Sequence, residues 1–257
     1  MKQYVVDAFT DQIFHGNQAA VCVLDTWLPD ELMRSMAREN NFSETAFTVK
    51  TANGYDLRWF TPGGEIELCG HATLGTSYVL FRYYEPNAEE IVFHTLSGDL
   101  FVRRDKEYLV MDFPALPHNE VPVTPLMAEA FGVVPEKAYL ADRLLLVYTD
   151  EQVIRQMVPD FAKVAKLDPH GVTVTAPGKE YDCVSRYFAP NLKINEDPVT
   201  GSAHCMLAPY WGEQLGKTTI RAYQASARGG ELLCEVKGER VVLKGKAVLY
   251  LVGDVYL

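Results

Sequence analysis

The chain has 257 residues, of which 48% are hydrophobic and 23% charged, so it can bury one large core or two cores of ordinary domain size and is not expected to be disordered. Its 24 basic and 34 acidic residues give a formal net charge of -10, which offers no electrostatic support for binding nucleic acid or an anionic membrane surface. No run approaches the roughly 18 uninterrupted apolar residues of a membrane span and no signal-peptide core forms at the N-terminus, so we expect a cytoplasmic protein that binds a small molecule.

The first fifty residues contain a predicted helix and a candidate base. Pro29-Asp30 opens a helical pattern, since proline is favoured in the first turn of a helix. Glu44 follows, between Phe42 and Phe47, just before a strand-like run. Burial against the two phenyl rings would disfavour the charged carboxylate, which suits a general base that works near neutral pH. The alternative is an exposed carboxylate at the end of a strand.

A repeat relates the two halves of the chain. Arg58-Trp59-Phe60-Thr61-Pro62 recurs as Arg186-Tyr187-Phe188-Ala189-Pro190, at an offset of 128 residues (186 - 58). Each copy leads to a glycine with small polar neighbours, Cys69-Gly70-His71 in the first half and Thr200-Gly201-Ser202 in the second. A second helical pattern opens at Pro159-Asp160, at a similar offset from the first. One short match can arise by chance, but three features in nearly one register favour a duplication.

The segments after the two glycines predict buried helices. Residues 71–81 are small or apolar on every side, which is typical of a helix that is buried all round and threads a sheet. Residues 202–215 are similar but include Pro209, which should end or kink the helix because proline lacks an N–H and clashes with the preceding turn. Short β-rich runs follow each helix, at 91–93, 100–102 and 109–113 and at 220–223, 232–236, 241–243 and 248–252.

Four prolines between Pro114 and Pro125 separate the two halves. We therefore expect two similar α+β domains, residues 1–116 and 117–257. We leave open that the last strand packs back on the first domain.

The two glycines place helix N-termini at loops, where unsatisfied N–H groups and the helix dipole favour a carboxylate or a developing enolate oxygen. If the repeat brings these ends together, the ligand would lie in a cleft between the domains. His71 can shuttle a proton, Asp197 can orient a histidine or bind a cationic group, and Ser202 can donate to a carboxylate. The alternatives are a satisfied core histidine for His71 and helix capping for Asp197 and Ser202.

The five cysteines are scattered and lack a CxxC pair, so neither a disulfide framework nor a zinc knuckle is predicted. Cys69 is interpreted as a small buried hydrophobic residue. The remaining histidines show no paired ligand spacing, so no metal site is expected.

Three motifs together resemble the PhzF-like phenazine biosynthesis family, within the diaminopimelate epimerase and proline racemase superfamily. They are SETAF at 43–47, LCGHAT at 68–73 and EDPVTGSA at 196–203, and the resemblance covers the whole chain. It implies an α+β fold with two copies of a β-barrel-like mixed sheet around a central helix, and an active site between them. It implies no metal or organic cofactor, and a homodimer.

The resemblance also implies residue roles. Glu44 would be the acid/base that moves a proton on the substrate, and Gly70, His71, Asp197, Gly201 and Ser202 would bind and orient it.

Two positions depart from related patterns. The racemase branch uses two thiols, whereas this chain has Cys69 before Gly70 but Thr200 before Gly201, which disfavours racemisation by two thiols. Asn17 precedes Gln18 where the family more often has proline, and Asn17 is still expected to approach the substrate.

The sequence therefore predicts a cofactor-independent isomerase that transfers a proton on a small carboxylated molecule. The rival from another class is a non-catalytic binding protein, since a fold does not determine a function. A hydrolase built from Ser202, His71 and Asp197 is less favoured because the serine lacks a GxSxG elbow.

Overall fold

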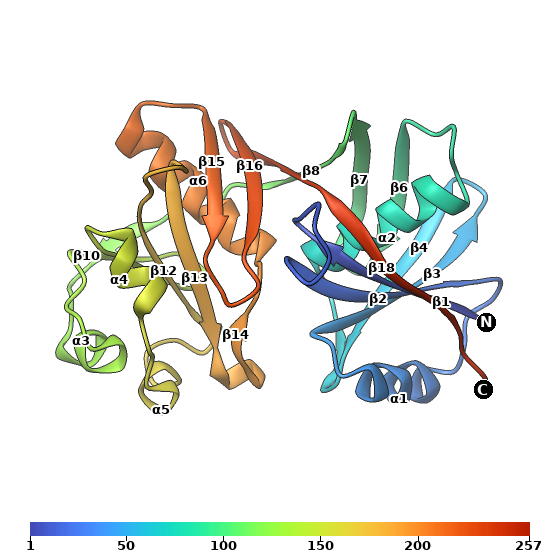
Figure 1. Ribbon diagram of the computed structural model, residues 1–257, viewed down its shortest axis with the longest axis horizontal. Coiled ribbons are helices and arrows are strands. Elements are labelled where there is room, and N and C mark those ends of the chain that lie inside the picture. Colours follow the sequence, from blue (N-terminus) through green and yellow to red (C-terminus); the bar gives the residue numbers. More distant parts are fainter. The chain divides into compact units, whose positions relative to one another are not determined.

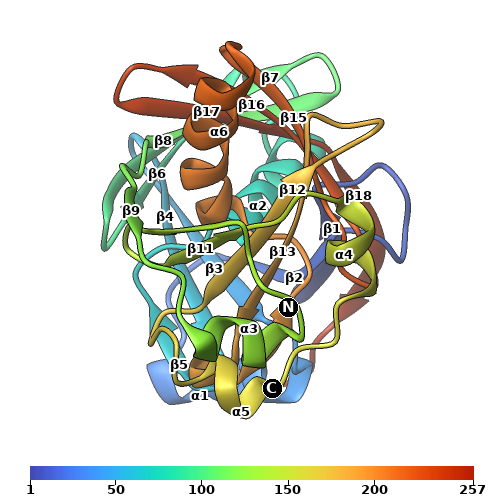
Figure 2. The ribbon, with the colours of Figure 1, turned by 90° about the vertical axis from the view of Figure 1, so that its left-hand side faces the viewer.

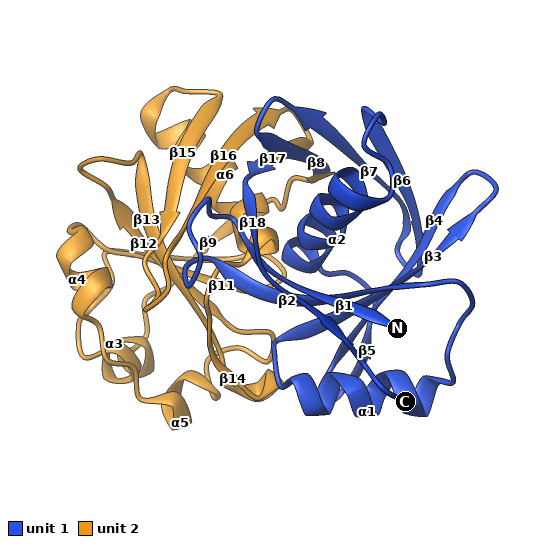
Figure 3. Ribbon diagram, turned by 45° about the vertical axis from the view of Figure 1, so that its right-hand side comes forward, with its two compact units in different colours: residues 1–112, 244–257 blue, residues 113–243 orange.

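The computed structural model describes residues 1–257, and the chain divides into two units (Figure 3). Unit 1 is Met1–Asp112 with Lys244–Leu257, and unit 2 is Phe113–Leu243. The division falls a few residues before the boundary predicted at 116/117. The C-terminal strand belongs to unit 1 because it pairs with the first strand of the chain.

Unit 1 is a mixed sheet with a central helix (Figure 1). Its strands pair antiparallel, except that β2 pairs parallel with β3 and β4 pairs parallel with β6. The strands are β1 (Lys2–Ala8), β2 (Asn17–Leu24), β3 (Glu44–Thr51), β4 (Gly54–Thr61), β5 (Gly64–Ile66), β6 (Glu90–Thr95), β7 (Gly98–Asp105), β8 (Tyr108–Pro114) and β18 (Ala247–Asp254).

Unit 2 repeats this pairing scheme. From β9 to β16 its strands pair antiparallel, except that β11 pairs parallel with β12 and β13 pairs parallel with β15. The strands are β9 (Asn119–Val121), β10 (Lys137–Leu140), β11 (Leu144–Val147), β12 (Val172–Pro177), β13 (Cys183–Ala189), β14 (Ile194–Asp197), β15 (Thr219–Gln224), β16 (Gly230–Lys237) and β17 (Arg240–Gly245). The two mixed α+β units confirm the fold class predicted from the repeat.

The repeated arginine has the same structural role in both units. Arg58 on β4 donates from Nε and Nη2 to the two carboxylate oxygens of Glu65, both at 2.7 Å. Arg186 on β13 donates in the same way to Glu196, at 2.7 and 2.8 Å. Each bidentate pair joins a strand to the short strand that leads to the central helix. The arginine of the sequence repeat therefore forms the same type of ion pair in both units.

The sheet of unit 1 has a different helix on each face (Figure 1). Helix α1 (Asp30–Asn40) packs Met33 and Met36 against Phe47 and Phe60. Helix α2 (Gly70–Tyr83) is the predicted buried helix, and most of its residues are buried. It contacts β1, β2 and β3, and its first turn lies close to the start of β3, because His71 faces Glu44 there.

In unit 2 the central helix is α6 (Gly201–Leu215), which lies against β15 and β16 (Figure 2). Of the two outcomes predicted for Pro209, an end or a kink, the structure excludes the first, because the helix continues to Leu215. Proline cannot donate to the carbonyl of Cys205, but the backbone N–H of Leu116 donates to that oxygen at 2.9 Å. A replacement donor from outside the helix therefore makes the proline tolerable.

The smaller helices of unit 2 surround a second apolar cluster, in which Phe131, Ile154 and Phe188 are buried. They are α3 (Pro125–Phe131), α4 (Glu151–Gln156), α5 (Phe161–Val164) and the 3-10 turn η1 (Pro190–Leu192). No helix in the chain is both long and apolar enough to cross a membrane.

Candidate active site

Glu44 is buried at the first position of β3. Its residue is 8% exposed, and the next three residues of the strand are buried as well. In the parallel pairing of β2 with β3, Glu44 is opposite Ala19, and this register fixes the position of the carboxylate along the strand. An extended strand start followed by apolar residues therefore places a carboxylate inside the protein, as the sequence predicted.

His71 meets this carboxylate from the first turn of α2. Its Nε2 lies 3.0 Å from Oε2 of Glu44, and both side chains are almost fully buried. The two atoms are within ion-pair distance but are not aligned as a hydrogen bond, and neither has another hydrogen-bond partner. Each can therefore still engage a third group.

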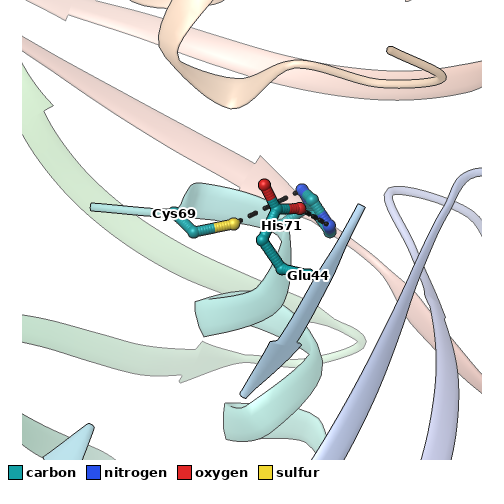
Figure 4. Close-up of side chains that lie close together, drawn as sticks. All are labelled: Glu44, Cys69 and His71. Atoms are coloured by element: carbon teal, nitrogen blue, oxygen red, sulfur yellow. Dashed lines mark hydrogen bonds and ion pairs between the residues drawn. The ribbon is translucent and has the colours of Figure 1, made fainter. Parts of the chain in front are cut away.

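Two more side chains contact the opposite nitrogen of the His71 ring. The amide nitrogen Nδ2 of Asn17 lies 3.2 Å from Nδ1, and the sulfur of Cys69 lies 3.6 Å from it. Figure 4 shows Cys69 and Glu44 at different ring nitrogens. The imidazole is therefore held between a carboxylate on one side and an amide with a thiol on the other.

Burial and the neighbouring side chains shift the pKa of His71 in opposite directions. Burial alone would lower the pKa of His71, but its charged and hydrogen-bonding partners raise that pKa well above the usual value. Burial first, and then the Glu44 carboxylate, raise the pKa of the Cys69 thiol, so the thiol is neutral near neutral pH. The partners that raise the pKa of His71 are therefore Cys69 and the carboxylate of Glu44.

The start of α2 provides backbone donors beside these side chains. Cys69 is the N-cap residue, with an extended backbone and no side-chain capping bond. No acidic residue lies in the first turn. The N–H groups that begin at Gly70 can therefore receive an anionic oxygen.

Unit 2 contains the other predicted site residues. Asp197 ends β14 and is 8% exposed, and its Oδ2 accepts from the hydroxyl of Thr200. Thr200 is the N-cap residue of α6, directly before Gly201. Ser202 is in the first turn, where its Oγ accepts from Nη1 of Arg143 at 3.1 Å.

Sequence reasoning missed two residues that contact Asp197, Thr200 or Ser202. Gln224 is fully buried and hydrogen-bonds to both Asp197 and Thr200. Arg143 lies between Asp142 and Ser202, with its guanidinium over the ring of Tyr187. Neither residue belongs to a motif, so no local signal could have identified it.

The described residues include one group that could hold a metal ion. One donor atom each from Glu44, Cys69 and His71 lie within 4.8 Å of one another. The spacing of histidines could not reveal this group, because it uses three different residue types. Cys69 and Glu44 contact different nitrogens of His71, and a histidine binds a metal ion through one nitrogen, so an ion held by all three residues would replace at least one of these contacts.

Comparison with known proteins assigns the family. A family model described as phenazine biosynthesis-like protein matches residues 6–253. An uncharacterized isomerase of Pseudomonas aeruginosa is 49% identical over 254 residues, which cover 99% of this chain and 98% of the relative. The crystal structure of a phenazine biosynthesis protein of the PhzF family from Enterococcus faecalis matches with a TM-score of 0.98 and 50% identity, over 100% of this chain and 99% of that chain.

A more distant structure shares only the fold. A hydroxyproline epimerase from Agrobacterium vitis, solved with bound trans-4-hydroxy-L-proline, matches with a TM-score of 0.61 and 8% identity, over 98% of this chain and 91% of that chain. The matching family model and the close relatives show that the chain belongs to the phenazine biosynthesis-like family, as an enzyme of the isomerase class.

Proposed function

We propose that the protein moves a proton between carbon atoms of a small carboxylated substrate without a cofactor. The observation that carries this proposal is the buried pair of Glu44 and His71, whose facing atoms lie 3.0 Å apart. Both atoms lack an aligned hydrogen-bond partner. Buried polar atoms are rarely left in this state, and at a helix N-terminus such a pair is suited to proton transfer.

In the proposed reaction, the Glu44 carboxylate takes a proton from a carbon next to a carboxylate or a double bond. The electron pair left behind spreads onto an oxygen, and the N–H groups at the start of α2 stabilise that negative charge. A proton is then returned to another carbon, by Glu44 itself or by protonated His71. The substrate loses one proton and gains one, so the reaction is an isomerisation.

His71 has two proposed roles. Its raised pKa keeps it protonated, so it can act as an acid. Its contacts with Asn17 and Cys69 hold the ring in one plane. The amide of Asn17 can present nitrogen to neutral His71, or oxygen to the protonated ring after a half-turn.

The remaining site residues are proposed to bind the substrate. Gly70 and Gly201 begin the two central helices, and Ser202 and Asp197 lie at the second of these starts. Asn17 is proposed to contact the substrate from beside His71. A cytoplasmic location and a homodimer also remain proposals, made from the resemblance.

The hydrolase is less well supported than the isomerase. A serine hydrolase needs a histidine that activates the serine. Ser202 instead accepts a hydrogen bond from Arg143, and His71 contacts Glu44, Cys69 and Asn17.

Proton NMR in deuterated water tests the proposal. The protein, Glu44→Gln and the control Glu151→Gln are incubated with a panel of small amino and hydroxy carboxylates. Glu151 is another buried glutamate, but it pairs with Arg155 in unit 2. We expect deuterium to enter a carbon position with the parent and Glu151→Gln, and about a thousandfold more slowly with Glu44→Gln.

Two results would contradict the proposal. Full exchange by Glu44→Gln would show that another group is the base. Ligand binding without exchange across the panel, detected by line broadening, would favour the non-catalytic binding protein.

A further inference from the structure

Gln224 is a fully buried polar residue near the second helix start, and the proposed chemistry does not use it. It is the last residue of β15 and has no exposed surface. Its backbone is paired with Ser185 of β13 on one side and Gly230 of β16 on the other. The side chain therefore projects from a rigid position inside the sheet.

The hydrogen bonds of Gln224 allow only one orientation of its amide. Its Oε1 lies 2.8 Å from the backbone nitrogen of Thr200, which can only donate. Its Nε2 lies 2.7 Å from the carbonyl oxygen of Asp197, which can only accept. The amide nitrogen thus faces the Thr200 hydroxyl oxygen, at 3.2 Å.

The direction of the Thr200 hydroxyl follows from this orientation. Because Oγ1 of Thr200 accepts from the amide of Gln224, its own proton is available for the nearest acceptor. That acceptor is Oδ2 of Asp197, at 2.5 Å. A hydroxyl that donates to a carboxylate stabilises the ionised form, so the chain from Gln224 through Thr200 to Asp197 is directional.

We propose that Gln224 is a positioning residue, which directs the Thr200 hydroxyl at Asp197 and thereby holds this carboxylate ionised and in one orientation. This proposal rests on the proposed role of Asp197 in binding the substrate. It also explains why the position that corresponds to the thiol of Cys69 cannot act as a second acid or base, since its hydroxyl is already engaged on both sides.

Unit 1 has no equivalent of this arrangement at the matching position. The last residue of β6 is Thr95, and its hydroxyl donates to the carbonyl of Gly98 within its own turn. The hydrogen-bond chain from Gln224 through Thr200 to Asp197 is thus specific to the second helix start, and it is not a consequence of the duplicated fold.

The first test follows the Asp197 carboxyl by carbon-13 NMR as pH is lowered, in the parent, Thr200→Val, Gln224→Met and the double variant. Loss of one hydrogen bond to a carboxylate should raise its measured pKa by about one pH unit. We expect this rise in each single variant and no further rise in the double variant, because both substitutions break one chain. This measurement needs no substrate, so it succeeds or fails independently of the proposed isomerase reaction.

The controls separate positioning from a general loss of stability. Thr175→Val removes a buried hydroxyl of β12 that bonds to Trp211 and the carbonyl of Val184, and it should leave the Asp197 titration unchanged. Gln224→Glu keeps the shape and the acceptor but loses the amide donor and adds a carboxyl group beside Asp197, so it should raise the pKa of Asp197 at least as much as Gln224→Met does. With a substrate from the exchange panel, both Gln224 variants should raise KM about tenfold and change kcat much less.

An unchanged Asp197 titration in both Gln224 variants would overturn the proposal. Additive shifts in the double variant would overturn it too, because they would mean that Gln224 and Thr200 act on Asp197 separately. Equal losses of kcat in the Gln224 variants and Thr175→Val would show a merely structural role.

Discussion

The starts of the two central helices have the same backbone arrangement and different chemistry. Cys69 and Thr200 are both N-cap residues with extended backbones. Four residues later, Thr73 and His204 both bond back to the carbonyl of the N-cap residue. The N-cap side chain contacts His71 in unit 1 and Asp197 in unit 2. Duplication therefore preserved the helix start, while the side chains around it diverged.

The two buried helical histidines show how strongly neighbouring groups change the pKa of a histidine. His71 faces the carboxylate of Glu44, and its pKa is raised well above the usual value. Burial lowers the pKa of His204 to about 4, since its one bonded partner is the carbonyl of Thr200. The same residue type is thus proposed as an acid in one helix and is a neutral structural residue in the other.

Among the tests that compare the two helix starts, substituting the two histidines in turn should give the largest effect. His71→Gln removes the proposed acid and should slow deuterium exchange about a hundredfold. His204→Gln should change exchange by less than about threefold while lowering the melting temperature, because it alters only a buried bond at the start of α6. Equal losses of exchange in both variants would mean that the two helix starts are not specialised in this way.

A pH titration sharpens the same contrast. The folded-state pKa of His71 is raised, so its contribution to stability is present below its unfolded pKa of about 6.5 and lost as pH rises through the folded pKa. For His204 the lowered pKa has the opposite sign, and stability is lost as pH falls from about 6.5 toward 4.

Nitrogen-15 NMR of the two rings measures both values. In Glu44→Gln the His71 value should fall below that of the parent while the His204 value stays the same. A His71 value that does not respond to Glu44→Gln would remove Glu44 as the cause of the shift.

The repeated arginines allow a comparison of stability. Arg186 bonds to Glu196 and also donates to the carbonyls of Ile154 and Met157. Arg58 is more exposed, and it shares its guanidinium between Glu65 and the exposed Asp30. Arg186→Met should therefore lower the free energy of unfolding, measured with urea, by about 3 kcal/mol, and Arg58→Met should lower it by about 1 kcal/mol. A larger loss for Arg58→Met would show that burial does not determine how much these ion pairs contribute to stability.

The smallest expected effect concerns Pro209. Replacing a proline inside a helix by alanine typically stabilises by about 3 kcal/mol. Here the carbonyl of Cys205 already accepts from Leu116, so Pro209→Ala should change the free energy of unfolding by less than about 1 kcal/mol. A gain near the full value would mean that the bond from Leu116 contributes little in solution.

Local pattern and resemblance predicted much of the fold and part of the site. The apolar character of residues 71–81 indicated a buried helix, and the structure has α2 at Gly70–Tyr83. The repeat indicated two similar units, and the strand pairings agree. Glu44 and His71 were proposed from motifs 27 residues apart (71 - 44), and the structure brings them into contact.

Other features could not be read from the sequence, because they depend on contacts between distant segments. The continuation of α6 through Pro209 needs a donor from Leu116. Gln224 reaches Asp197 only because β13 and β15 are neighbours in the sheet. Cys69 looked like an ordinary buried residue, yet its sulfur contacts the ring of His71.

The sequence by itself determined the periodic and repeated properties of this protein: its buried central helices, its strands, and its duplicated arginine and glycine motifs. These depend on spacing along the chain, which sterics and burial translate directly into local structure. Only the tertiary structure decided which polar atoms meet, and hence which histidine has a raised pKa and which hydroxyl donates to Asp197. Hydrogen bonds and charges act over a few ångströms in space, so their partners are set by the packing of strands and helices and not by their order in the chain.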